Sequence, residues 1–132
     1  MAKKINYPLL SDAFNSSDIN EGIKVLKSKF ITMSKITKKF ETLFAKKMGA
    51  KYALMTNSGS SANLLAMSCL TSKLLKKRLK DNDEVIIPAI CWSTSLWPII
   101  QNNLKPVFVD VDLNSFNIDA NQIIKKINKR TK

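Results

Sequence analysis

KYALMTNSGSSANLLAM, residues 51–67, joins two different hydrophobic patterns in one continuous stretch. Residues 51–56 are an apolar run of strand length, and from Ser60 onward the apolar residues recur at helical spacing. Between the two patterns, residues 57–61 contain one glycine and three serines. The stretch therefore predicts a strand at 51–56, a turn of small residues, and a helix from about Ser60 to Leu75.

The turn at residues 57–61 has the features of an anion site. The first N–H groups of a helix lack carbonyl partners within the helix, and the helix dipole favours negative charge beside them. We therefore expect this turn to hold the phosphate of a small cofactor. An ordinary helix cap would account for the same serines, so the turn alone leaves the two interpretations about even.

Hydrophobic spacing elsewhere in the chain predicts further helices and strands. We expect helices at 18–28, 34–48 and 93–103, strands at 84–88 and 105–111, and a final helix capped by Asp119. The alternation of strands and helices from residue 51 onward predicts a three-layer α/β fold, a mainly parallel sheet with helices on both faces.

The same alternation predicts how the chain is organised. We expect an N-terminal helical segment over residues 1–50 and an incomplete α/β domain over residues 51–132. The domain is expected to be incomplete because the alternation requires another strand after Lys132, and three parallel strands would leave an exposed sheet edge. We therefore expect a fragment of a longer chain.

Ligands of parallel sheets bind beyond the carboxyl ends of the strands. The predicted loops at 57–61, 88–95 and 110–118 all follow strands, so they are expected to share this edge. Trp92, in the second loop, would offer a flat ring for stacking beside the phosphate turn. For Trp97, farther along the next helix, we expect a place in the core instead.

The net charge of +12 would suit nucleic-acid binding, but only two of the 22 basic residues are arginines. Arginine provides the bidentate contacts that base readout favours. The densest basic stretch, residues 73–80, contains three leucines and is typical of a helix end with a solvated face. We therefore expect no nucleic-acid partner. No apolar run approaches the ~20 residues of a membrane span, and the cysteines lack metal spacing, so we expect a cytoplasmic chain without a membrane partner.

The residue types present exclude several kinds of chemistry. The chain has no histidine, which excludes Ser-His-Asp and Cys-His pairs within it and disfavours a zinc site. The turn at 57–61 lacks the spacing of a P-loop and of the GxGxxG motif. For the carboxylates Asp110, Asp112 and Asp119, strand-end turns and helix caps are the favoured explanation over a metal site.

Five segments, in this order and spacing, make nearly the whole chain similar to one family. They are FETLFA (40–45) before Gly49, NSGSSANLLA (57–66), DEVIIP (83–88), WST (92–94) and PVFVDVD (106–112). The chain resembles the DegT/StrS family of sugar aminotransferases, which are pyridoxal 5′-phosphate (PLP) enzymes of the aspartate-aminotransferase-like fold, fold type I. The resemblance implies that residues 51–132 belong to the large domain of that fold.

The resemblance also implies roles for individual residues. Gly59, Ser60 and Ser61 are expected to hold the PLP phosphate, and Trp92 to lie flat against the pyridine ring. The family's Schiff-base lysine and the aspartate that pairs with the pyridine nitrogen lie beyond Lys132, so we assign no catalytic residue and no metal ligand. The family is commonly dimeric, with active sites at the subunit interface.

From this resemblance we expect the N-terminal portion of a PLP-dependent aminotransferase. It would act on nucleotide-linked keto sugars, with glutamate as the usual amino donor, in the biosynthesis of cell-surface polysaccharide or lipopolysaccharide. Residues 58–65, SGSSANLL, look especially like the branch that contains sugar 3-dehydrases, in which histidine replaces the Schiff-base lysine. Such a dehydrase is one alternative, and a noncatalytic α/β module that binds anions is another.

Overall fold

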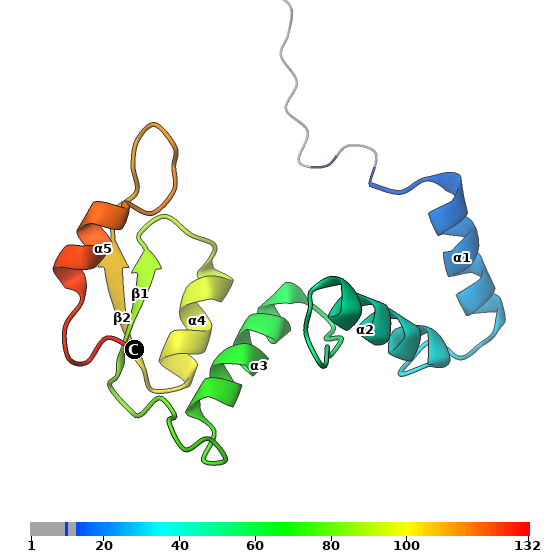
Figure 1. The fold of residues 1–132 in the computed structure, drawn as a ribbon. Helices are drawn as coiled ribbons and strands as arrows, with labels where there is room; N and C mark the ends of the chain where they lie inside the picture. The colour runs from blue at the N-terminus through cyan, green and yellow to red at the C-terminus, as the bar shows by residue number, and fades with distance from the viewer. Residues whose placement is uncertain (1–9, 11–12) are drawn as a thin grey trace, which may run out of the picture. The chain divides into compact units, whose positions relative to one another are not determined.

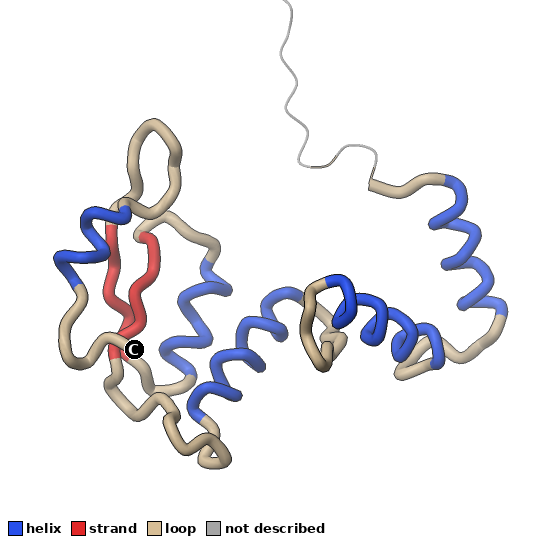
Figure 2. The backbone as a smooth tube through the Cα atoms, in the orientation of Figure 1, coloured by secondary structure: helices blue, strands red, loops and turns tan. Residues whose placement is uncertain are grey.

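The computed structural model describes residue 10 and residues 13–132. The chain divides into two compact units, Met1–Leu54 and Met55–Lys132. Figures 1 and 2 draw the helices and strands of both units. Within the described ranges, none of the helices has the length and apolarity that crossing a bilayer requires.

The first unit contains helices α1 (Ser16–Lys27) and α2 (Lys35–Lys47). α2 confirms the prediction for residues 34–48 closely, because local signals define both of its ends. At the start, the Ser34 hydroxyl accepts a hydrogen bond from the N–H of Ile36. After the end, Gly49 adopts a left-handed conformation with a φ of +66°. That conformation favours glycine, so the helix stops there.

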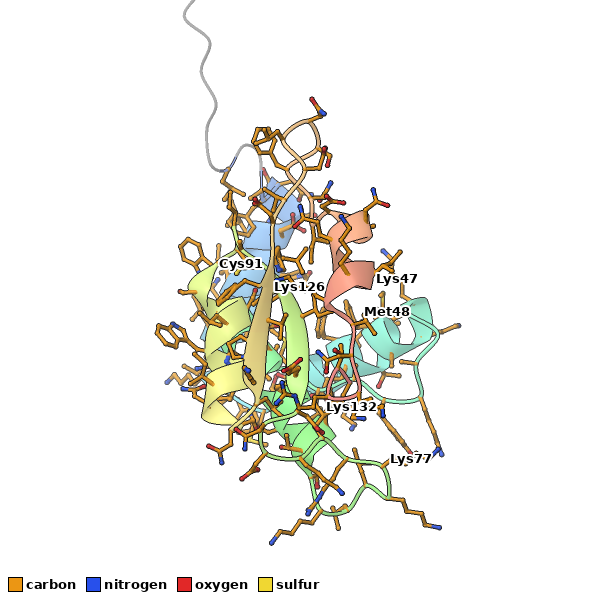
Figure 3. All side chains as sticks on the ribbon, turned by 90° about the vertical axis from the view of Figure 1, so that its left-hand side faces the viewer. Lys47, Met48, Lys77, Cys91, Lys126 and Lys132 are labelled. Carbon is orange, nitrogen blue, oxygen red and sulfur yellow. The ribbon has the colours of Figure 1, made fainter. Side chains whose placement is uncertain are left out.

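The second unit contains the α/β part of the chain. Its elements are α3 (Gly59–Thr71), β1 (Glu84–Pro88), α4 (Ser93–Gln101), β2 (Lys105–Val109) and α5 (Ala120–Lys126). β1 and β2 pair in parallel, with Glu84 opposite Lys105 and Pro88 opposite Val109. Figure 3 shows α4 and α5 on opposite sides of the strands, which confirms the predicted three-layer α/β fold.

The predicted strand at 51–56 is wrong, because the sheet in the described part of the chain consists of β1 and β2. A strand needs a hydrogen-bonded neighbour, and the partners of β1 are segments that follow it in the chain. β2 lies along one edge. At the other edge, the N–H of Glu84 donates to the Arg130 carbonyl at 2.8 Å, and Thr131 bridges Glu84 in parallel. Residues 51–56 therefore remain outside this sheet.

Two predicted element ends are also wrong. α3 ends at Thr71, so the basic stretch 73–80 is a loop and not a helix end. The N–H of Leu79 donates to the Leu70 carbonyl at 2.9 Å, which folds this loop back onto the helix. β2 ends at Val109 and not at Val111, because Val111 forms an antiparallel bridge with Ile118 instead.

The outer edge of β2 lacks one hydrogen-bond donor. Lys105 donates its N–H to Asp83 at 2.9 Å, and the Val109 carbonyl accepts from Ala89 at 2.7 Å. The backbone groups of Pro106, between them, therefore point away from β1. Because proline has no N–H, Pro106 weakens this edge as a place where another strand could pair.

The core of the second unit lies between α4 and the sheet. Ile87 of β1, Ile99 of α4 and Leu104 before β2 are buried together. Partly buried side chains of Met67, Leu79, Val85 and Leu96 pack against them. α3 packs against α4, so the start of α3 is positioned through α4.

Candidate cofactor site

The turn before α3 is organised by its own hydroxyl groups. The Ser58 hydroxyl accepts the N–H of Ser61 at 3.2 Å and lies 3.2 Å from the Ser61 hydroxyl. The Thr56 hydroxyl donates to the Ser58 carbonyl at 2.9 Å. Ser58 is therefore the helix cap, and the hydroxyl of Ser60, which is exposed, is not needed for that purpose.

The backbone at the start of α3 fits a phosphate group. Gly59 and Ser60 are the first two residues of the helix, and within the described part of the chain only the next N–H, that of Ser61, is capped. A Cβ added at Gly59 would meet nothing within 4 Å, so a ligand can approach the backbone closely there. Two open N–H donors, a hydroxyl and the positive end of the helix dipole together suit a dianion.

Trp92 lies at the point where the loop after β1 becomes α4. It occupies the N-cap position, and its carbonyl accepts the N–H of Ser95 at 2.9 Å. An indole packed into the core would have contradicted a stacking role. The Trp92 side chain is instead 76% exposed, so its ring is available to a flat ligand.

The starts of α3 and α4 lie side by side. The side-chain amide of Asn63 donates to the Thr94 carbonyl at 3.5 Å. A groove of about 220 Å³ separates the two helices at this end, and it is lined by Ser60, Ser61, Leu64, Thr94, Trp97, Pro98 and Gln101. Ser60 and Ser61 of the predicted phosphate turn therefore line the same groove as Thr94, which is two residues after Trp92.

Trp97 is not a core residue, because 53% of it is exposed. α4 turns Leu96 and Ile99 toward the core, and Trp97 lies about 100° farther around the helix than Leu96. Sequence reasoning also missed Asn63 and Thr94. The helical spacing of Thr94, Trp97 and Gln101 was the signal that places these three on one face.

The carboxylates after β2 serve the local backbone, as predicted. The Asp112 carboxylate accepts from the N–H of Ser115 at 2.8 Å and of Asn114 at 3.1 Å, and these hydrogen bonds lower its pKa. Asp119 caps α5 by accepting from the N–H of Asn121 at 2.9 Å. The residues that the structure describes contain no group of three or more His, Cys, Asp and Glu side chains that could hold a metal ion.

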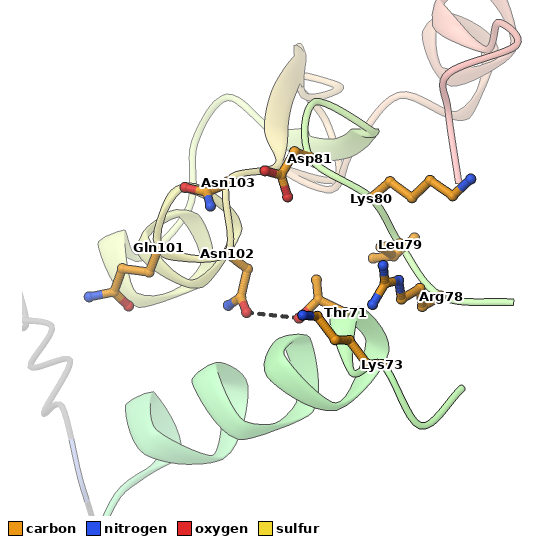
Figure 4. Close-up of a pocket in the computed structure, with 9 residues that line it drawn as sticks. All are labelled: Thr71, Lys73, Arg78, Leu79, Lys80, Asp81, Gln101, Asn102 and Asn103. Carbon is orange, nitrogen blue, oxygen red and sulfur yellow. Dashed lines mark hydrogen bonds between the residues drawn. The ribbon is translucent and has the colours of Figure 1, made fainter. Parts of the chain in front are cut away.

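A larger pocket lies at the other end of α3 and α4. Its volume is about 590 Å³, and it is lined by Thr71, Lys73, Arg78, Leu79, Lys80, Asp81, Gln101, Asn102 and Asn103 (Figure 4). Figure 3 shows Lys77 of the basic loop and Cys91 of the loop before α4 near opposite ends of the strands. Because both helices end at this pocket, its basic side chains offset the negative ends of two helix dipoles. They are not in themselves a sign of an anion site.

The described features are those of an α/β domain whose open helix N-terminus and exposed indole suit a phosphate-bearing, flat ligand. Residues 13–132 match the DegT/DnrJ/EryC1/StrS aminotransferase family, and the chain belongs to this family.

Two relatives illustrate the range of activities in the family. The chain is 44% identical over 128 residues to the GDP-4-keto-6-deoxy-D-mannose 3-dehydratase of Escherichia coli O55:H7, covering 97% of this chain and 33% of the relative. It is 34% identical over 109 residues to the dTDP-3-amino-3,6-dideoxy-alpha-D-galactopyranose transaminase of Aneurinibacillus thermoaerophilus, covering 83% of this chain and 28% of the relative.

Solved structures show the same fold. The chain matches the E. coli GDP-4-keto-6-deoxy-D-mannose-3-dehydratase with bound hydrated PLP at a TM-score of 0.85 and 44% identity, over 97% of this chain and 33% of that one. The PLP form of Spr1654 from Streptococcus pneumoniae matches at a TM-score of 0.77 and 26% identity, over 97% of this chain and 31% of that one. The chain thus spans about a third of the length of these proteins.

Proposed function

We propose that this chain forms the PLP-binding portion of an enzyme that acts on nucleotide-linked keto sugars in the biosynthesis of cell-surface polysaccharide. One observation carries the proposal: the open N-terminus of α3 lies beside the start of α4, where an indole is exposed. Membership of a family in which solved structures hold PLP supports the identity of the ligand.

The candidate residues have two roles in this proposal. The N–H groups of Gly59 and Ser60 and the hydroxyls of Ser60 and Ser61 bind the phosphate, through hydrogen bonds that its negative charge strengthens. Trp92 covers one face of the pyridine ring. When bound, PLP supplies an electron sink for the substrate carbon that carries the amino group. The chain's own residues hold and orient the cofactor.

Two overall reactions fit this site. In amino transfer, the amino group of a donor such as glutamate replaces the keto oxygen of the sugar, and the donor leaves as a 2-keto acid. In 3-dehydration, the sugar loses its 3-hydroxyl as water and keeps its keto oxygen, while the amino donor supplies the two electrons, leaves as a 2-keto acid and releases its nitrogen as ammonia. A specific observation favours the second reaction: the 3-dehydratases of E. coli and Yersinia pseudotuberculosis are 44% and 38% identical to this chain, whereas the transaminase above is 34% identical. Mass spectrometry after incubation with nitrogen-labelled glutamate distinguishes them, because only transfer leaves the label in the sugar.

We also propose that the protein acts as a cytoplasmic homodimer. The apolar side chains of Leu64, Leu65 and Leu70 are exposed on α3, and an apolar surface of this kind is commonly covered by another protein surface. We further propose that the helical segment 1–50 and the α/β domain 51–132 are separate structural parts. Sedimentation of the purified protein tests the dimer, because a monomer at micromolar concentration would contradict it.

Cofactor binding is the direct test of the proposal. We expect Trp92→Ala to weaken PLP binding by up to about tenfold, because stacking contributes about 0.5–1.5 kcal/mol beyond the buried area. Phe116→Ala is the matched control, since it removes an aromatic ring that is 73% exposed and does not line the groove, and we expect a change below about twofold. Fluorescence titration measures both affinities.

Pyridoxal, which lacks the phosphate, tests the other half of the site. We expect pyridoxal to bind far more weakly than PLP to the unmodified protein, because the start of α3 contributes only when a phosphate is present. Equal affinity for the two compounds would overturn the role of Gly59, Ser60 and Ser61. Binding of many unrelated polyanions with a steep salt dependence would favour the noncatalytic module instead.

A further inference from the structure

A proline within α4 leaves one backbone carbonyl without its helical partner. Pro98 is the sixth residue of the helix, and it is buried. In a regular helix, its N–H would donate to the carbonyl of Thr94, four residues earlier. Proline has no N–H, so the first turn of α4 lacks that hydrogen bond. This turn directly follows Trp92.

A side chain from α3 reaches the carbonyl that the proline leaves free. The amide nitrogen of Asn63 donates to the Thr94 carbonyl at 3.5 Å, which is a long hydrogen bond. Asn63 lies one helical turn beyond Gly59, at the start of the same helix. The Asn63 side chain therefore joins the helix that begins with the phosphate turn to the turn that follows Trp92.

We propose that Asn63 is a positioning residue for the cofactor site. This inference rests on the proposed function, in which the phosphate is bound by α3 and the ring is stacked on Trp92. A short linker joins the phosphate of PLP to its ring, so the affinity depends on how these two helix starts lie relative to each other. Asn63 stabilises that arrangement by replacing the hydrogen bond that Pro98 removes from the first turn of α4.

The other end of the helix pair offers a matched comparison. There the Thr71 hydroxyl lies 3.1 Å from the side-chain oxygen of Asn102, and the Asn102 amide donates to the Pro98 carbonyl at 2.8 Å. This contact also joins α3 to α4, but it is far along both helices from Gly59 and Trp92. Loss of this contact should affect stability without affecting the cofactor site.

The test is a double-mutant cycle on Asn63 and Pro98 in the full chain. All variants carry Trp97→Phe, so that Trp92 is the only tryptophan. Asn63→Leu keeps the size of the side chain and removes the donor. Pro98→Ala restores an N–H that can donate to Thr94 within α4. Two quantities are measured: the PLP affinity, by quenching of Trp92, and the anisotropy of Trp92 without PLP, which reports the order of its loop and not activity.

We expect Asn63→Leu to weaken PLP binding by about three- to tenfold, the range for loss of one hydrogen bond, and to lower the anisotropy of Trp92. In the Pro98→Ala background, the same substitution should change the PLP affinity by less than about twofold, because the N–H of the new alanine then donates to the Thr94 carbonyl in place of Asn63. Thr71→Val, the control, should leave both the PLP affinity and the anisotropy unchanged.

The outcomes separate this inference from the proposed function. An equal effect of Asn63→Leu in both backgrounds would overturn the compensation between Asn63 and Pro98. If Asn63→Leu leaves the PLP affinity unchanged while Trp92→Ala weakens it, the positioning role fails and the cofactor site stands. If the unmodified protein does not bind PLP, the proposed function fails, and the cofactor role of Asn63 fails with it.

Discussion

Truncation of Ile99 to alanine should destabilise the second unit strongly. Ile99 is 2% exposed and lies with Ile87 and Leu104 at the centre of the core between α4 and the sheet. Removing most of a buried isoleucine side chain costs about 2–5 kcal/mol, through lost burial and the cavity left behind. We expect about 3 kcal/mol here, because three segments meet at this residue and little room is left for collapse.

Ile100→Ala is the matched control on the same helix. Ile100 is the next residue and is 45% exposed, so the same chemical change should cost less than about 1 kcal/mol. Urea denaturation followed by tryptophan fluorescence measures both free energies of unfolding. For a unit of this size, a loss of about 3 kcal/mol corresponds to a fall in melting temperature of roughly 12–24 °C.

One result would refute the packing described for α4: equal destabilisation by Ile99→Ala and Ile100→Ala. If Ile99→Ala does not fold, Ile99→Val provides the measurement. Its expected cost is about 0.5–1.5 kcal/mol, which leaves a folded protein whose loss of stability can still be compared with that of Ile100→Val.

Three further predictions follow from single residues. A hydrogen bond from Asn128 at 2.7 Å and an ion pair with Arg130 at 2.9 Å lower the pKa of the Glu84 carboxyl. A carboxyl whose pKa is lowered by folding stabilises the protein above its unfolded-state pKa, and this stabilisation is lost as the pH falls through its folded-state pKa. Glu84→Gln should therefore lower the free energy of unfolding at neutral pH, and the difference from the unmodified protein should shrink in acid. Gly59→Ala should leave thermal stability unchanged, since its Cβ meets no atom within 4 Å, yet weaken PLP binding; an unchanged affinity would argue against close approach of the phosphate. Pro106→Val adds an N–H to the outer edge of β2, and sedimentation should show species larger than those of the unmodified protein, whereas an unchanged size distribution would contradict the protective role of Pro106.

Comparison of α2 and β1 with their predictions shows what a sequence pattern can establish. The hydroxyl of Ser34 and the positive φ of Gly49 bound α2 where the sequence predicted. β1 occupies residues 84–88 as predicted, because this apolar run has the length of a strand and its residue Ile87 is buried against Ile99 of α4. The ends of α2 depend on residues within a few positions of one another, so the sequence alone determines them, whereas β1 also needs β2 as its hydrogen-bonded neighbour.

The predicted strand at 51–56 and the buried position predicted for Trp97 failed for a different reason. An apolar run becomes a strand only where another segment supplies hydrogen bonds, and in the described part of the chain the partners of β1 are β2 and, at Glu84, Thr131. Trp97 faces the groove and not the core because the rotation of α4 is set by the burial of Leu96 and Ile99.

The amino-acid sequence by itself determined the order of elements from α3 onward, the open helix start at Gly59 and the placement of Trp92 after a buried strand. Only the tertiary structure decided that Asn63 reaches the carbonyl freed by Pro98, because the residues lie in different helices. Local propensity depends on neighbours along the chain. Contact between two helices depends on how both pack against a common core, and no local pattern encodes that.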